Sequence, residues 1–317
     1  METVERPASW KILLAFAIIY FVWGSTFLAI RVGVHEVPPF LLAALRFFVA
    51  GIVLYGWMRL KGTPPPTGRQ WAGATLLGTL IFLVDYGCLF WAEQRVPSGI
   101  AAVVLATIPV FITLLEIIVL RTQRLTVRLG LALLLGLCGV AVLTGQSFSF
   151  GEVPINRAGA LALLVASVTW SVATILTRRL PLPDSKPMSA AAQMITGGVQ
   201  LFVLSAVSDE FNGFRVQTVS RNAWFALLYL IVAGSIVGFT AYIWLLHYES
   251  PTKVGTYAYV NPVVAVALGY FIAKEAVGPR TLLGALLILV SVIAIATTPK
   301  RSSATTKRST LSTAEAD

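Results

Sequence analysis

Charged residues are scarce in this sequence. Only 12% of its 317 residues are Asp, Glu, Lys or Arg, and 57% are hydrophobic. A soluble domain usually carries about twice that charged share, so the excess apolar side chains are expected to face lipid. The net charge of +10 sits in short clusters between apolar runs. No stretch of the sequence combines basic and aromatic residues into a face that would suit a nucleic acid, which argues against such a partner.

Histidine and cysteine are also rare, with two residues of each. His35 and His247 are expected at opposite ends of their spans and on opposite membrane faces, so they cannot share a site. Cys88 and Cys138 lie in apolar runs without metal-ligand spacing and are interpreted as packed hydrophobic residues. The sequence contains no zinc-protease motif, nucleophile elbow or phosphate loop. It therefore predicts no enzyme, no cofactor and no metal, and a membrane-embedded enzyme remains the weaker alternative.

Long apolar runs dominate the rest of the chain. A helix needs about 20 mostly apolar residues to cross the hydrocarbon core. Ten candidate spans occur in order, separated by proline, glycine and charged residues: 11–30, 39–59, 71–92, 97–120, 126–145, 157–177, 188–207, 222–247, 251–273 and 279–297. The sequence thus predicts an all-α integral membrane protein with ten transmembrane helices.

Basic residues predict the orientation of these spans. If the N-terminus is cytoplasmic, most of the 24 Lys and Arg residues fall in inner segments. The positive-inside rule then places both termini in the cytoplasm. The predicted organisation is a cytoplasmic segment 1–10, a first half 11–145, a periplasmic loop 146–156, a second half 157–297 and a disordered cytoplasmic tail 298–317. The expected location is the bacterial inner membrane.

The two halves share a pattern. Trp23 leads to Arg31 at the same spacing as Trp170 leads to Arg178. Small residues at 50–51 correspond to a glycine pair at 197–198. Each half holds an odd number of spans, so the second must enter the membrane the other way up. Two inverted five-helix repeats around a central cavity are typical of secondary transporters.

Pro109 and Pro262 lie near the centres of their spans. Proline lacks an N–H, so the carbonyls of Leu105 and Ala258 are expected to be free at the bilayer centre. Protein groups or a water-filled cavity must then satisfy them, and the side-chain amide of Asn261 lies beside the second proline. Two ordinary kinks repaired by local hydrogen bonds are the alternative explanation.

Three charged residues are predicted well within spans. Arg46 and Asp85 both lie about 4.5 Å from the midplane on the same side. We expect them to share a polar cavity, where they could pair directly, bind a zwitterionic substrate, or let Asp85 carry a coupling proton. A purely structural ion pair is the competing interpretation. Glu116 lies nearer the inner end of its span and is predicted either to snorkel toward the membrane surface or to pair with Arg121 or Arg124.

Aromatic and hydroxyl side chains fill the rest of the predicted cavity. Trp23 and Trp170 lie deep in repeat-equivalent spans and are expected to line it. The further candidates in the predicted spans are Tyr86, Thr174, Thr240, Tyr242 and Trp244. Trp10, Trp71 and Trp224 lie near span ends, where aromatic belts form.

Several of these segments resemble a known family. They are Trp23-Gly24-Ser25-Thr26-Phe27 with Arg31, the pair Arg46-Phe47, the segment 96–102 and the segment 257–263. Together they are similar to EamA-type permeases of the drug/metabolite transporter superfamily, most closely to its YedA-like exporters. The resemblance covers roughly 11–297. It implies ten helices, two EamA repeats, and export of small metabolites or drugs through a central cavity.

The resemblance also implies site residues. Positions that line or flank the family's cavity match Trp23, Ser25, Thr26, Tyr257, Tyr259 and Asn261. The expected partners are a small-molecule substrate, the lipid bilayer and, as a coupling ion, protons. A channel-like facilitator stays open as an alternative, and the sequence specifies neither the substrate nor the oligomeric state.

Overall fold

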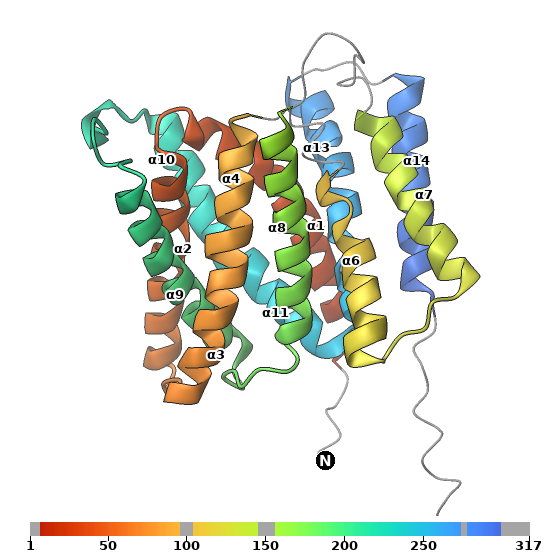
Figure 1. The fold of residues 1–317 in the computed structure, drawn as a ribbon, viewed down its shortest axis with the longest axis horizontal. Coiled ribbons are helices and arrows are strands. Elements are labelled where there is room, and N and C mark those ends of the chain that lie inside the picture. The colour runs from red at the N-terminus through yellow and green to blue at the C-terminus, as the bar shows by residue number, and fades with distance from the viewer. Residues whose placement is uncertain (1–6, 96–103, 145–155, 274–277, 299–317) are drawn as a thin grey trace, which may run out of the picture.

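The computed structural model describes residues 7–95, 104–144, 156–273 and 278–298. Throughout these ranges the chain forms helices, turns and loops, with no β-strand. The helices stand side by side as a bundle (Figure 1). The predicted loop 146–156 falls outside the described residues up to residue 155, and the predicted tail falls outside them from residue 299.

Six helical stretches are long and apolar enough to cross a membrane. In the first half they are α1 (Ser9–Val34), α2 (Pro39–Leu60) and the run of α3 (Gly68–Gly78), η1 (Thr79–Tyr86) and α4 (Gly87–Glu93). In the second half they are α8 (Arg157–Leu176), α9 (Lys186–Val207) and the run of α10 (Arg221–Tyr229), η5 (Leu230–Val237) and α11 (Gly238–Tyr248). The predicted spans over these regions are therefore helical.

The remaining helices are shorter or interrupted. They are α6 (Ile108–Leu115) with η2 (Glu116–Leu120), α7 (Val127–Thr144), the single-turn α12 (Pro251–Val254), α13 (Tyr257–Ala273) and α14 (Pro279–Ala296). A short 3₁₀ turn, η4, covers Val216–Thr218. The predicted span 251–273 is thus two helices, because the backbone turns at Gly255 and Thr256.

Helix starts follow local capping chemistry. The side chains of Asn156, Ser185, Ser220 and Ser250 each accept a backbone N–H of the first helical turn. Such caps satisfy donors that the helix itself leaves without a partner. Helices α9 and α12 also carry a proline in the first turn, where no N–H is needed.

The same irregularity occurs in both halves. Segments η1 and η5 are π-helical, each 8 residues long, and each interrupts an otherwise α-helical span. π-Helical turns are rare and frequently occur at functional sites. Their matching places in the third span of each half support the duplication that the sequence pattern predicts.

The two predicted prolines differ in placement. Pro109 lies in the first turn of α6, directly after a turn at Ala106 and Thr107. Pro262 lies inside α13, which continues through it, and the chain breaks earlier, at Gly255 and Thr256. The expectation of equivalent helix breaks at Pro109 and Pro262 is therefore corrected. A proline in a first turn costs no hydrogen bond, whereas Pro262 removes one from its helix.

Glycines allow helices of opposite halves to approach closely. Helices α2 and α9 pack along each other, as do α7 and α14. A Cβ added to Gly198 of α9 would lie 2.7 Å from the backbone nitrogen of Phe48 in α2. A Cβ on Gly51 of α2 would lie 2.8 Å from the backbone nitrogen of Ile195 in α9. Small residues at such contacts are what let membrane helices pack by van der Waals contact.

We predict that Gly198→Ala destabilises the protein and Gly56→Ala does not. The first methyl meets α2 backbone and forces the two helices apart, at a cost of about 1–3 kcal/mol. The second lies in α2 with nothing within 4 Å and removes the helix penalty of glycine. Thermal unfolding in detergent should show a lower Tm for Gly198→Ala alone. Equal Tm values would contradict close packing at this contact.

Candidate functional site

Five aromatic rings from five helical segments meet at the centre of the bundle. Trp23 of α1 is 5.6 Å from Trp170 of α8, 5.3 Å from Tyr242 of α11 and 4.8 Å from Tyr257 of α13, measured between ring centroids. Tyr86 of η1 is 6.1 Å from Trp170. These separations are those of contacting rings. We call these five residues the central cluster; all were predicted as cavity residues.

Hydrogen bonds hold the rings of the central cluster in place. Trp23 Nε1 donates to the Gly234 carbonyl at 3.0 Å, and the hydroxyls of Thr174 and Tyr242 lie 2.5 Å apart. The indole N–H of Trp170 faces the hydroxyls of Tyr242 and Tyr257, yet it meets no acceptor with hydrogen-bond geometry among the described residues. Trp170 Nε1 is thus a buried donor without a hydrogen-bond partner among the described residues.

Arg46 is one of the most deeply buried side chains, with 1% of its surface exposed. Its Nε donates to Ser235 Oγ at 2.9 Å, which joins α2 of the first half to η5 of the second. Its guanidinium lies 4.6 Å from the Phe47 ring centroid and 5.4 Å from that of Tyr86. The bond to Ser235 and the contacts with the rings of Phe47 and Tyr86 thus help to anchor the arginine beside the central cluster.

Asp85 lies next to Tyr86 and is 4% exposed. Among the described residues no hydrogen bond and no ion pair reaches its carboxylate, but it interacts electrostatically with the hydroxyls of Tyr242 and Tyr257. A buried carboxylate without a partner is costly and is a candidate for binding a proton or a substrate. Direct pairing of Asp85 with Arg46, one of the predicted alternatives, is therefore not seen in this structure, where Arg46 Nε bonds Ser235 instead.

The other predicted site residues lie around the cluster or away from it. Thr26 Oγ1 bonds the Trp23 carbonyl, and Ser25 Oγ lies 2.5 Å from Tyr229 OH at the exposed side of α1. Asn261 is 6% exposed, and its side-chain oxygen has no partner among the described residues. Tyr259 donates to the Leu133 carbonyl at 3.0 Å and packs with α7 and α14. Tyr259 is thus separate from the central cluster.

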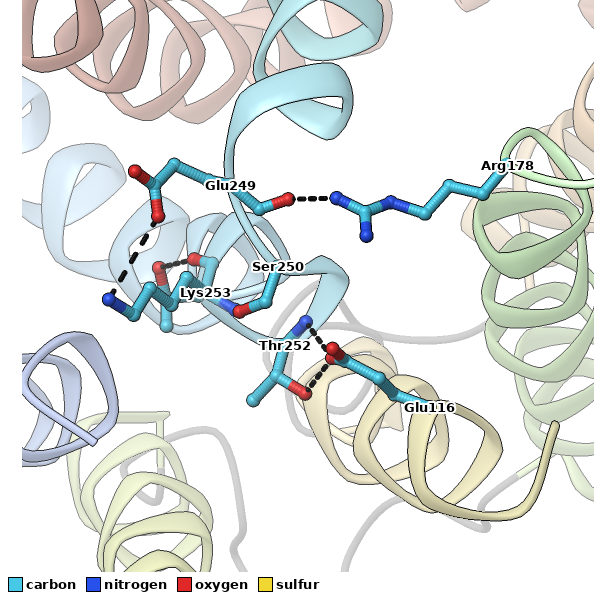
Figure 2. A network of polar contacts seen from close by, with 7 residues as sticks. Glu116, Arg178, Glu249, Ser250, Thr252 and Lys253 are labelled. Carbon is cyan, nitrogen blue, oxygen red and sulfur yellow. Dashed lines mark hydrogen bonds and ion pairs between the residues drawn. The ribbon is translucent and has the colours of Figure 1, made fainter. Parts of the chain in front are cut away.

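A second polar network lies at the end of the bundle where α6, α8 and α11 finish (Figure 2). Glu116, 1% exposed, accepts from Thr252 N at 2.9 Å, from Thr252 Oγ1 at 2.7 Å and from Thr122 Oγ1 at 2.9 Å. It therefore caps α12, across the boundary between the halves. The prediction that Glu116 snorkels or pairs with Arg121 or Arg124 missed this role, although a threonine after a Ser-Pro helix start is a signal for such a donor.

Arg178 joins α8 to the same network. Its guanidinium donates to the carbonyls of Leu246, at 2.7 Å from Nη2, and of Glu249. Burial lowers the pKa of Arg178, and the carboxylates of Glu116 and Glu249 oppose that shift. Lys253 Nζ lies 3.9 Å from Glu249 Oε2. We call Glu116, Arg178, Glu249, Thr252 and Lys253 the end network.

Comparison with known proteins identifies the family. Residues 9–145 and 157–297 each match the EamA-like transporter family. The chain belongs to that family. The inner membrane transporter YedA of Escherichia coli K12, itself uncharacterized, is 36% identical over 279 residues, which cover 87% of this chain and 88% of YedA. The uncharacterized transporter YoaV of Bacillus subtilis is 26% identical, over 89% of this chain and 95% of YoaV.

The fold of this EamA-family protein also occurs among solved structures. One crystal structure, 22% identical in sequence, matches with a TM-score of 0.73 over 90% of this chain and 98% of the other. The two EamA matches fall on the two stretches that share the paired π-helical irregularity. The resemblance inferred from the motifs is confirmed, and the chain is a multi-pass membrane protein.

We predict that Glu116→Gln destabilises this EamA-family protein. The amide keeps one acceptor oxygen but places an NH₂ group where a carboxylate oxygen now accepts, so one buried donor loses its partner. The expected cost is about 1–3 kcal/mol. Thermal unfolding of the variant beside Asp184→Asn, an exposed acid in the loop before α9, tests this. A Tm for Glu116→Gln that matches the control would show that the end network adds no stability.

Proposed function

We propose that this protein is a secondary transporter that exports a small metabolite, an amino acid or a drug across the inner membrane. The observation that carries the proposal is the central cluster. It takes Trp23 and Tyr86 from the first half and Trp170, Tyr242 and Tyr257 from the second. Binding sites at the interface of two repeats are characteristic of secondary transporters. The names of YedA and YoaV, both transporters, agree with it.

The proposed mechanism is alternating access between two inverted five-helix repeats with ten spans in all. The opposite chain directions of α1 and α8 in Figure 1 support the inversion. In the proposed orientation both termini are cytoplasmic, so the end network lies at the cytoplasmic end. There it links η2 of the first half to α8, α11 and α12 of the second. We propose that this network holds the cytoplasmic end closed while the central cluster opens toward the other side.

Within this proposal the predicted site residues take different roles. The rings of the central cluster and Thr174 form the walls of the binding site. Arg46, already bonded to Ser235, holds α2 against η5. Asp85 is the group that binds a proton or a cationic part of the substrate, because its carboxylate is buried and has no partner among the described residues.

We predict that Asp85→Asn abolishes the pH dependence of transport. The transported substrate for this assay is first found by screening candidate metabolites and drugs for accelerated efflux from proteoliposomes. The asparagine cannot exchange a proton, so its rate should fall roughly tenfold or more and stay flat with pH. Asp184→Asn should behave as wild type. A wild-type rate and pH profile for Asp85→Asn would contradict the assigned role, and counterflow in the same vesicles separates a carrier from a channel.

We also predict opposite exposure of two loops. Two single-cysteine variants are made in a background with Cys88 and Cys138 replaced by alanine. Pro65→Cys places the cysteine between α2 and α3, and Gln217→Cys places it in η4 between α9 and α10. A membrane-impermeant maleimide added to intact cells should label only the Gln217→Cys variant. Labelling after cell lysis gives the maximum extent of labelling for each variant. Labelling of both in intact cells, or of Pro65→Cys alone, would contradict the proposed orientation.

A further inference from the structure

A lateral groove of ≈ 630 Å³ lies on the outside of the bundle, away from the central cluster. The start of α1, the end of α2, the start of α9 and the η5–α11 run form it. Its polar and aromatic end is lined by Trp10, Lys11, Trp57, Lys61 and Trp244. Its floor is apolar, with Leu14, Ala15, Ile18, Leu54 and Ile236. One end of the groove, which we call its mouth, is thus cationic and aromatic, and the rest of the groove is apolar.

The mouth carries charge of one sign. Lys11 Nζ lies 5.7 Å from the Trp10 ring centroid, and Lys61 Nζ lies 4.8 Å from that of Trp57. Both lysines are exposed, and none of the residues that line the groove is Asp or Glu. The two ammonium groups are therefore held beside rings at the mouth, without a carboxylate in the groove to neutralise them.

The position of the groove in the membrane defines what can fill it. Tryptophan and lysine at the ends of α1 and α2 mark the level of the lipid headgroups. The apolar floor extends from there to Ile236 near the end of η5, within the hydrocarbon. An occupant that meets both parts needs an anionic head and an apolar tail. A free phosphate would leave the floor uncovered, and a zwitterionic headgroup brings its own cation toward the lysines.

We propose that this groove is a binding site for one anionic phospholipid of the leaflet at this end of the bundle. Its phosphate lies between Lys11 and Lys61, and one acyl chain lies along Leu14 and Ile18. Basic pockets between membrane helices recognise anionic headgroups by charge. The site is independent of the transport proposal, since no residue of the central cluster or the end network lines it.

Brominated lipids test the proposal, because bromine quenches nearby tryptophan fluorescence and three tryptophans line the groove. The purified protein is reconstituted in phosphatidylcholine with increasing fractions of phosphatidylglycerol or phosphatidylcholine brominated on the acyl chain. We expect the anionic lipid to quench at lower fractions. In the double variant Lys11→Gln/Lys61→Gln, the preference for the anionic lipid over phosphatidylcholine should fall about tenfold. The single variant Trp57→Phe should show a smaller selective component, because it removes one of the reporting rings.

Two further variants keep the test decisive. Lys11→Arg/Lys61→Arg retains the charge and should retain the selectivity, which separates charge from loss of fold. Arg124→Gln removes an exposed charge at the same end but outside the groove and should quench as wild type does. Equal quenching of wild type by both lipids, or unchanged selectivity in Lys11→Gln/Lys61→Gln, would overturn the proposal. The tryptophans would then form an aromatic belt only.

Discussion

The hydrocarbon interior contains no water, so every polar group within the spans must find its partner in the protein. Here many of those partners lie in the other half of the chain. Arg46 of α2 bonds Ser235 of η5, and Trp23 of α1 bonds a carbonyl of the same segment. Tyr259 of α13 bonds a carbonyl of α7. Several of the hydrogen bonds that satisfy buried groups thus also join the two halves.

The π-helical segments η1 and η5 lie at the centre of the bundle, and η5 takes part in two of these contacts. A π-turn inserts extra backbone into a helix and rotates the next turns, so side chains before and after it leave the regular 3.6-residue pattern. Segment η1 carries Asp85 and Tyr86, and η5 carries Gly234 and Ser235, which receive bonds from Trp23 and Arg46. Because both irregular segments occur in the same span of each half, a duplicated element supplies both sides of the centre.

The sequence predicts the long helices from patterns within a single segment, and it singles out residues that meet in the central cluster by comparing the two halves and by family resemblance. Apolar length defines α1, α2 and α8, and repeat-equivalent spacing singles out Trp23 and Trp170. It fails for Glu116 and Tyr259, whose partners Thr252 and Leu133 are far away in the chain. The pattern also favours a break at Pro262, whereas the chain turns before α13, since proline is only one of several ways to end a helix. Tertiary contacts decide such cases.

The two polar sites differ in how readily they can rearrange. At the centre, rings contact on several sides, so opening must separate surfaces that come from five segments. At the end network, one carboxylate holds Thr252 and Thr122 by three hydrogen bonds, next to a four-residue helix and a turn. Only the two bonds from Thr252 cross between the halves. Bonds to a charged acceptor contribute about 1.5–3 kcal/mol each, so these two together are on the order of the roughly 5.5 kcal/mol that reverses a two-state population. In the proposed cycle a contact of that size at one end is sufficient to select which side of the membrane the central cluster faces.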